Sequence, residues 1–231
     1  MTTAGQQDDL KSLAYRTTRH NIGVLLASRP DVAGRVVPAT PDWTVRDLLA
    51  HLVGIARSVL GRLSGTPLAD AFPGATADLA ELLAEWNRVG PLVEPLLATP
   101  TGHDLRPMLM DAYTHELDIR LALGAAWPTD HPAFDGALDL LVAGFSRAVR
   151  ERGLPSVRIE LDGRRWQAGD GTPTTTVSGH RLDVYRSFAG RRTPKQIAGL
   201  AWSADPRPWL PAFEWGPFHP PTRPVETLVS R

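Results

Sequence analysis

The chain has 231 residues, of which 42% are hydrophobic and 22% are charged, and its 25 basic residues balance its 25 acidic ones. This composition is typical of a globular protein, and a net charge of zero supplies no overall field that would hold nucleic acid or an anionic membrane. The sequence contains no cysteine, which excludes disulfides, thiolate metal ligands and a cysteine nucleophile. Any thiol chemistry therefore needs a sulfur supplied by a small molecule.

The sequence contains no membrane-spanning or secretory segment that we can recognise. No stretch approaches the roughly 18 uninterrupted apolar residues of a membrane helix. The N-terminus, with the sequence MTTAGQQDD, lacks the basic and apolar regions of a signal peptide. We therefore expect a cytoplasmic protein that does not contact a membrane.

Apolar residues recur at helical spacing through the first two thirds of the chain. They predict five helices, over residues 9–28, 44–63, 79–97, 104–124 and 134–152. Pro91 and Pro95 are expected to kink or split the third helix, and Gly124 to stop the fourth. A polar loop is expected before the second helix.

The start of the second helix has a specific capping signal. Thr44 can cap the helix, and Asp47 stands at the third helical position, as in a capping box. Trp43 precedes the cap and can pack onto Leu48 as a hydrophobic staple. The pattern predicts a helix that begins directly after Trp43.

The pattern changes after residue 153. Residues 157–161 alternate with period two, Asp162-Gly163 is a favoured tight-turn pair, and residues 164–167 can return as a second strand. A helix over about 180–190, a strand over 196–202 and an extended proline-rich tail after Trp215 complete the prediction. We expect an α+β protein, with a helical domain over 1–153 and a small α/β domain over 154–231.

Three side chains of metal-ligand type project from apolar helix faces. His51 shares a face with Leu48 and Leu52, while Asp111 and His115 are four residues apart and so lie about one turn from each other on the fourth helix. A carboxylate and two imidazoles suit zinc, and also nickel, cobalt or ferrous iron. Three protein ligands leave one coordination position open, which is typical of a catalytic site.

The residues alone also allow a simpler interpretation, in which His51 is a hydrogen-bonded core histidine and Asp111 and His115 form a local pair. Asp118 can support a ligand by accepting a hydrogen bond from an imidazole, or it can be a surface acid. The remaining histidines have no comparable spacing and are interpreted as structural or solvent-facing: His20, His103, His131, His180 and His219.

Three segments resemble a known family. The segment WTVRDLLAHL at 43–52 and the segment DAYTHELDIRLALG at 111–124 resemble motifs of the mycothiol-dependent maleylpyruvate isomerase family, which is part of the DinB-like set of metal-binding helical bundles. Residues 177–192 are similar to the small C-terminal α/β domain of that family. The resemblance covers nearly the whole chain and implies a DinB-like four-helix bundle followed by the α/β domain.

The resemblance also implies a function. It assigns His51, Asp111 and His115 to a divalent metal, with zinc favoured, and mycothiol to the open position. Asp111 stands where the isomerase itself usually has Glu, which leaves the metal identity open. Arg191 and Arg192 are the cations that the resemblance favours for clamping an anionic substrate, although a solvated basic stretch is the alternative.

We therefore expect an enzyme that uses a low-molecular-weight thiol for cis–trans isomerisation or S-transfer on a small electrophile. The expected partners are these two small molecules, with no nucleic acid, and the expected state is a monomer or a homodimer. One alternative is a non-catalytic metal- or ligand-binding module whose C-terminal aromatic residues line an apolar pocket. The other is a metal-dependent hydrolase with Glu116 as base, although its position on the helix turns Glu116 outward, away from His115.

Overall fold

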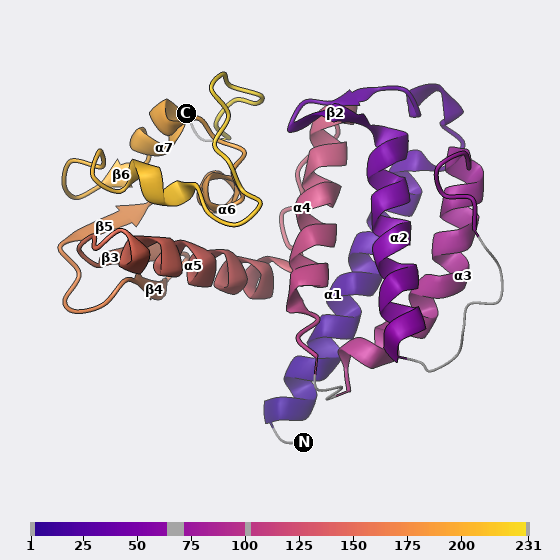
Figure 1. The fold of residues 1–231 in the computed structure, drawn as a ribbon, viewed down its shortest axis with the longest axis horizontal. Coiled ribbons are helices and arrows are strands. Elements are labelled where there is room, and N and C mark those ends of the chain that lie inside the picture. Colours follow the sequence, from indigo (N-terminus) through magenta and orange to yellow (C-terminus); the bar gives the residue numbers. More distant parts are fainter. Residues whose placement is uncertain (1–2, 64–71, 100–102, 230–231) are drawn as a thin grey trace. The chain divides into compact units, whose positions relative to one another are not determined.

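The computed structural model describes residues 3–63, 72–99 and 103–229. The chain divides into two compact units, Met1–Ala137 and Leu138–Arg231, which are described separately (Figure 1). The expected class, α+β, is confirmed. The division differs from the expected one at residue 153, because most of the fifth helix packs within the second unit. Among the described residues, no helix has both the length and the apolar character needed to span a membrane.

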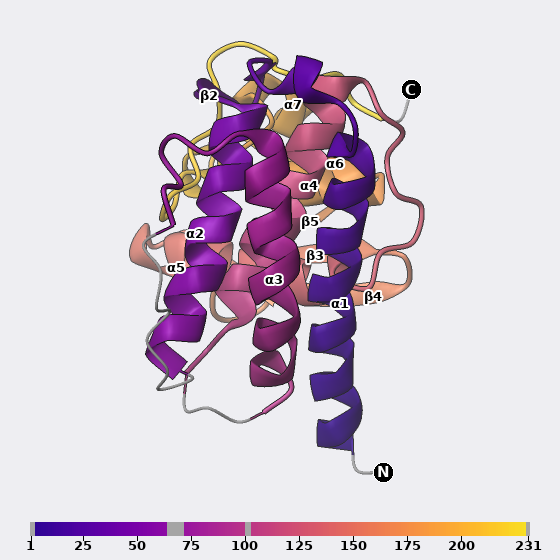
Figure 2. The ribbon, with the colours of Figure 1, turned by 90° about the vertical axis from the view of Figure 1, so that its right-hand side faces the viewer.

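The first unit is a four-helix bundle (Figures 1 and 2). Helices α1 and α2 each contact both α3 and α4, so the four helices close around one core. The core is formed mainly by buried aliphatic residues, and it also includes the aromatic residues Tyr15 and Trp86. The bounds of the helices are α1 Thr3–Leu26, α2 Val45–Leu63, α3 Leu79–Leu97 and α4 Arg106–Leu123.

Two features of the bundle differ from the sequence predictions. Helix α3 continues through Pro91 and Pro95. Of the two expected effects of these prolines, a kink or a split, the split does not occur. The segment before α2 is not only a polar loop, because it holds a 3-10 turn and a short antiparallel pair of strands. Their bounds are η1 Pro30–Val32, β1 Val36–Val37 and β2 Thr40–Thr44.

The predicted ends of α2 and α4 are confirmed. The Thr44 and Asp47 backbone amides donate reciprocally to the Asp47 and Thr44 side chains, at 3.0 and 3.2 Å, which is the capping-box arrangement. Helix α4 ends at Gly124, whose φ of 64° is a left-handed conformation that glycine adopts without strain. These signals fix where the residues of α2 and α4 stand along their helices.

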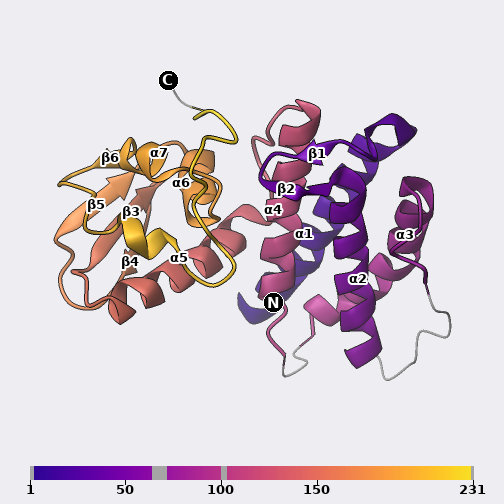
Figure 3. The ribbon, with the colours of Figure 1, turned by 45° about the horizontal axis from the view of Figure 1, so that its top comes forward.

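The second unit is built on a four-stranded sheet with the strand order β4-β3-β5-β6 (Figure 3). The predicted hairpin of β3 and β4 is confirmed, with Leu161 opposite Arg164 and positive φ angles at Asp162 and Gly163. Strand β5 pairs parallel to β3, and β6 pairs antiparallel to β5. The strand bounds are β3 Val157–Leu161, β4 Arg164–Ala168, β5 Thr175–Ser178 and β6 Ala201–Trp202.

The helices of this unit enclose an aromatic core. Phe145, Phe188 and Phe213 have ring centroids 4.6–5.1 Å apart. The strand expected over 196–202 was largely wrong, because its first half lies in a short capped helix and only its end is β6. The remaining bounds are α5 Phe134–Glu151, α6 Arg181–Phe188, α7 Pro194–Ala198 and η2 Leu210–Phe213.

A buried hydrogen bond joins two helices of the bundle. The Trp86 indole Nε1–H donates to the Tyr15 hydroxyl at 2.8 Å, and both side chains are almost completely buried. The Tyr15→Phe variant leaves the indole N–H without its acceptor. We expect it to lower the free energy of unfolding by about 1–3 kcal/mol at neutral pH, measured by urea denaturation.

The same tyrosine makes the stability of the protein sensitive to alkali. Burial raises the pKa of Tyr15 to about 12, above the value of about 10 for an unfolded chain. Its contribution is complete below pH 10 and is lost as the pH rises through 12. The wild type should therefore lose more stability than Tyr15→Phe over this range, and equal losses would contradict the assignment.

Candidate metal site

Helices α2 and α4 bring the three predicted ligands together. His51 stands on the second turn of α2, while Asp111 and His115 stand one turn apart on α4. One nitrogen or oxygen of each side chain lies within 4.8 Å of the others. His51 Nε2 is 3.1 Å from Asp111 Oδ2, and His115 Nε2 is 3.4 Å from Asp111 Oδ1. Asp111 thus offers one oxygen to each histidine.

The second nitrogen of His115 also has a carboxylate partner. Its Nδ1 is 3.1 Å from Asp118 Oδ2, and the Asp118 side chain is completely buried. A carboxylate at this position fixes the orientation and tautomer of a ligating imidazole. Of the two roles that the sequence allowed for Asp118, the structure supports the one inside the site.

The charges of the site stabilise one another. Burial alone would raise the pKa of Asp111, but hydrogen bonds with His115 and His51 hold it well below its usual range. Burial alone would lower the pKa of His115, but hydrogen bonds with Asp111 and Asp118 raise it to about 8. Without a metal, the two carboxylates therefore keep His115 largely protonated at neutral pH.

Trp43 is part of the site, which the sequence analysis did not predict. Its ring centroid lies 4.9 Å from that of His51 and 6.0 Å from that of His115. A usable signal was present, because a side chain that staples onto Leu48 also reaches the residue three positions later on the same helix face. That residue is His51.

Glu116 does not face outward as expected, because it is completely buried. It accepts hydrogen bonds from Asn21 at 3.0 Å and from Arg120 at 2.8 Å, and it lies 3.1 Å from His131 Nε2. A four-helix bundle covers α4 on more than one side, which single-helix geometry does not reveal. This network makes His131 structural.

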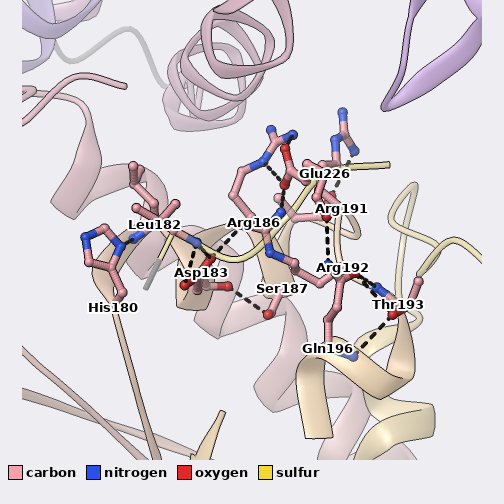
Figure 4. Close-up of polar contacts among 12 residues, drawn as sticks. His180, Leu182, Asp183, Arg186, Ser187, Arg191, Arg192, Thr193, Gln196 and Glu226 are labelled. Atoms are coloured by element: carbon pink, nitrogen blue, oxygen red, sulfur yellow. Dashed lines mark hydrogen bonds and ion pairs between the residues drawn. The ribbon is translucent and has the colours of Figure 1, made fainter. Parts of the chain in front are cut away.

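Arg191 and Arg192 are both buried in the second unit (Figure 4). Arg192 pairs with Asp183 at 2.7 Å and with Glu226, and Arg186 binds Glu226 through two hydrogen bonds of 2.8 and 2.7 Å. Arg191 donates to the Ala189 carbonyl at 2.8 Å. These residues are not a solvated basic stretch. The substrate-clamp role stays a prediction, and the ion pairs of Arg192 favour a structural role.

Comparisons with known proteins agree with this architecture. A family model for the DinB superfamily matches residues 14–127. The chain is also similar to a crystal structure of a histidine-to-alanine mutant of the mycothiol-dependent maleylpyruvate isomerase, with a TM-score of 0.54 and 18% identity. The likeness covers 89% of this chain and 97% of that chain. No curated protein matches the sequence.

The fold and the site together define a helical-bundle domain with a candidate three-residue metal centre, followed by a small α/β unit. The bundle, over residues 14–127, belongs to the DinB superfamily. The resemblance to the maleylpyruvate isomerase family that the motifs indicated is thus supported, and at 18% identity the structural likeness establishes the fold alone.

The ion pairs of the second unit predict a structural effect of Arg192→Ala. This change leaves buried Glu226 and Asp183 short of a positive charge, so we expect a loss of stability of about 3–5 kcal/mol, measured by chemical denaturation. Arg165→Ala is the matched control, because Arg165 is a highly exposed arginine of the same unit. A stable Arg192→Ala protein would instead leave the clamp role open.

The raised pKa of His115 predicts proton release on metal binding, since an imidazole must be neutral to ligate. His115 is protonated below about pH 8 in the metal-free protein. Metal uptake at pH 7 should therefore release about one more proton than uptake at pH 9. Calorimetry in buffers of different ionisation enthalpy measures this number, and equal release at both pH values would contradict the prediction.

Proposed function

We propose that this protein is a metal-dependent enzyme that uses a low-molecular-weight thiol, mycothiol, for cis–trans isomerisation or S-transfer on a small electrophile. The observation that carries the proposal is the convergence of His51, Asp111 and His115, whose ligand atoms lie within 4.8 Å of one another. The fold likeness to a mycothiol-dependent isomerase supports the choice of thiol.

The residues of the site fit a divalent metal. Two imidazole nitrogens and one carboxylate oxygen are ligands that zinc accepts, and three protein ligands leave a position for a further one. Nickel, cobalt and ferrous iron accept the same set of ligands. Zinc is the first metal to test, because the family resemblance favours it. A metal at this site would lower the pKa of a bound thiol enough to ionise it near neutral pH.

The chain itself orients the candidate ligands and leaves the site open to small molecules. Asp118 holds the Nδ1 side of His115, which leaves the Nε2 side directed toward Asp111. His51 and Asp111 are only partly buried, so the site is accessible from outside the bundle. Because the sequence has no cysteine, the reacting sulfur must come from the cosubstrate.

The two alternative functions have less support. Glu116, the base considered for a hydrolase, is engaged by Asn21, Arg120 and His131. For the ligand-binding module, the aromatic residues expected to line a pocket instead pack on one another, as Phe213 does with Phe145 and Phe188. No specific observation favours either alternative over thiol chemistry.

The metal site is tested by metal content. Purified wild type should bind one equivalent of zinc after reconstitution, measured by elemental analysis and calorimetry. His51→Ala, Asp111→Ala and His115→Ala should each weaken binding by at least about 100-fold, more than the loss of an outer hydrogen-bond partner would. His20→Ala, at an exposed histidine of the same unit, should bind like the wild type.

The reaction is tested with the reconstituted protein, mycothiol and an electrophile. Isomerisation of maleylpyruvate would change its absorption while the amount of free thiol stays constant. S-transfer to an aryl halide would consume one thiol for each halide released. A protein that binds metal but turns over neither substrate with mycothiol would contradict the enzymatic part of the proposal, while a protein that binds no metal would contradict all of it.

A further inference from the structure

The two histidines of the candidate site are held in different ways. His115 is almost completely buried and has a carboxylate on each ring nitrogen, with Asp111 on one side and Asp118 on the other. The His51 side chain is 32% exposed, and its ion-pair partner is Asp111. Within the part of the chain that the structure describes, His51 has no second carboxylate corresponding to Asp118.

A ligating imidazole normally needs a partner besides the metal. Such histidines usually donate their other N–H group to a carboxylate, a carbonyl or a water, and this bond fixes the ring. His51 instead has the indole ring of Trp43 beside it, with a centroid distance of 4.9 Å and an interplanar angle of 52°. The His115 ring contributes a second aromatic contact at 5.3 Å, edge to face.

Trp43 is well placed to hold a neighbour, because its own backbone is fixed. It is the residue before the Thr44 cap of α2, and Thr44 makes reciprocal hydrogen bonds with Asp47. Its side chain also packs against the buried core of the bundle. The indole is therefore restrained through its backbone and through its side chain, and the partly exposed ring of His51 lies against it.

We propose that Trp43 is a positioning residue for His51, and that aromatic contact does for this histidine what the Asp118 carboxylate does for His115. The proposal rests on the metal-binding role of His51 proposed above. It predicts that the flat face of the Trp43 ring, and not its N–H group, is what the site requires. Phenylalanine at position 43 should then preserve the zinc affinity, whereas leucine should not.

The first test compares the zinc affinities of the wild type, Trp43→Phe and Trp43→Leu by competition with a chelating dye. Trp43→Leu should weaken binding by about tenfold, which corresponds to the upper range for one aromatic contact, and Trp43→Phe should stay within threefold of the wild type. Trp166→Phe is the control, because Trp166 belongs to the second unit and contacts Asp139 and Arg164 of that unit. Wild-type affinity in Trp43→Leu would overturn the proposal, as would equal weakening in Trp43→Phe and Trp43→Leu.

The second test uses metal-free protein and so separates this proposal from the proposed function. In NMR spectra, the His51 ring carbon–proton signals, assigned by their loss in His51→Ala, should show ring-current shifts and restricted motion in the wild type and in Trp43→Phe. Both properties should be lost in Trp43→Leu. A His51 ring equally mobile in all three proteins would overturn the positioning role, whether or not zinc binds.

Unfolding temperatures of the metal-free variants check that each protein is folded. If the wild type binds no zinc but its His51 ring is restricted by Trp43, the proposed function fails while the aromatic contact stands. If zinc binds equally well to every variant, the metal site stands and the role of Trp43 fails.

Discussion

The site of this protein depends on one carboxylate shared between two helices. Asp111 offers one oxygen to His51 on α2 and the other to His115 on α4. A partly buried carboxylate is costly unless it has partners, so this carboxylate favours the arrangement in which the second turn of α2 faces Asp111 on α4. Asp118 contacts the second ring nitrogen of His115, and the indole ring of Trp43 lies beside that of His51.

Helix α4 carries polar networks on two sides. Toward α2 it presents Asp111 and His115, and elsewhere on its circumference it presents Glu116 to Asn21 of α1 and to His131 of the following loop. His115 on the first side and Glu116 on the second are both buried, so the usual division between an apolar and a wet face does not hold for this helix. The second network fixes the loop after α4, which leads the chain out of the bundle.

The sequence predicted the structural elements that have a long periodic pattern or a strong local signal. The five helices and the Asp162-Gly163 hairpin follow from spacing and turn chemistry. The meeting of His51 with Asp111 and His115 does not follow from spacing alone, because spacing also allowed a local Asp111–His115 pair, and the family resemblance favoured the three-residue site. The pair β1 and β2 and the helix α7 are two to five residues long, too short for periodicity to distinguish. The direction of the Glu116 side chain was predicted wrongly, because it depends on which helices surround α4. The contacts of Trp43 depend on how the residues at the start of α2 pack against the bundle. Both are properties of the tertiary structure.

The charges buried in the second unit come from distant parts of the sequence. Arg186 and Arg192 both pair with Glu226, and Arg192 pairs with Asp183 as well, so two carboxylates balance the two arginines. Asp183 also accepts a hydrogen bond from the Val229 amide. During synthesis these arginines emerge well before Glu226 does, and domains tend to fold from the N-terminal side as the chain grows. The hydrogen bonds and ion pairs of Glu116 join residues between 21 and 131, so this network can form while translation continues. The second unit acquires its neutral interior only after residue 226 has left the ribosome.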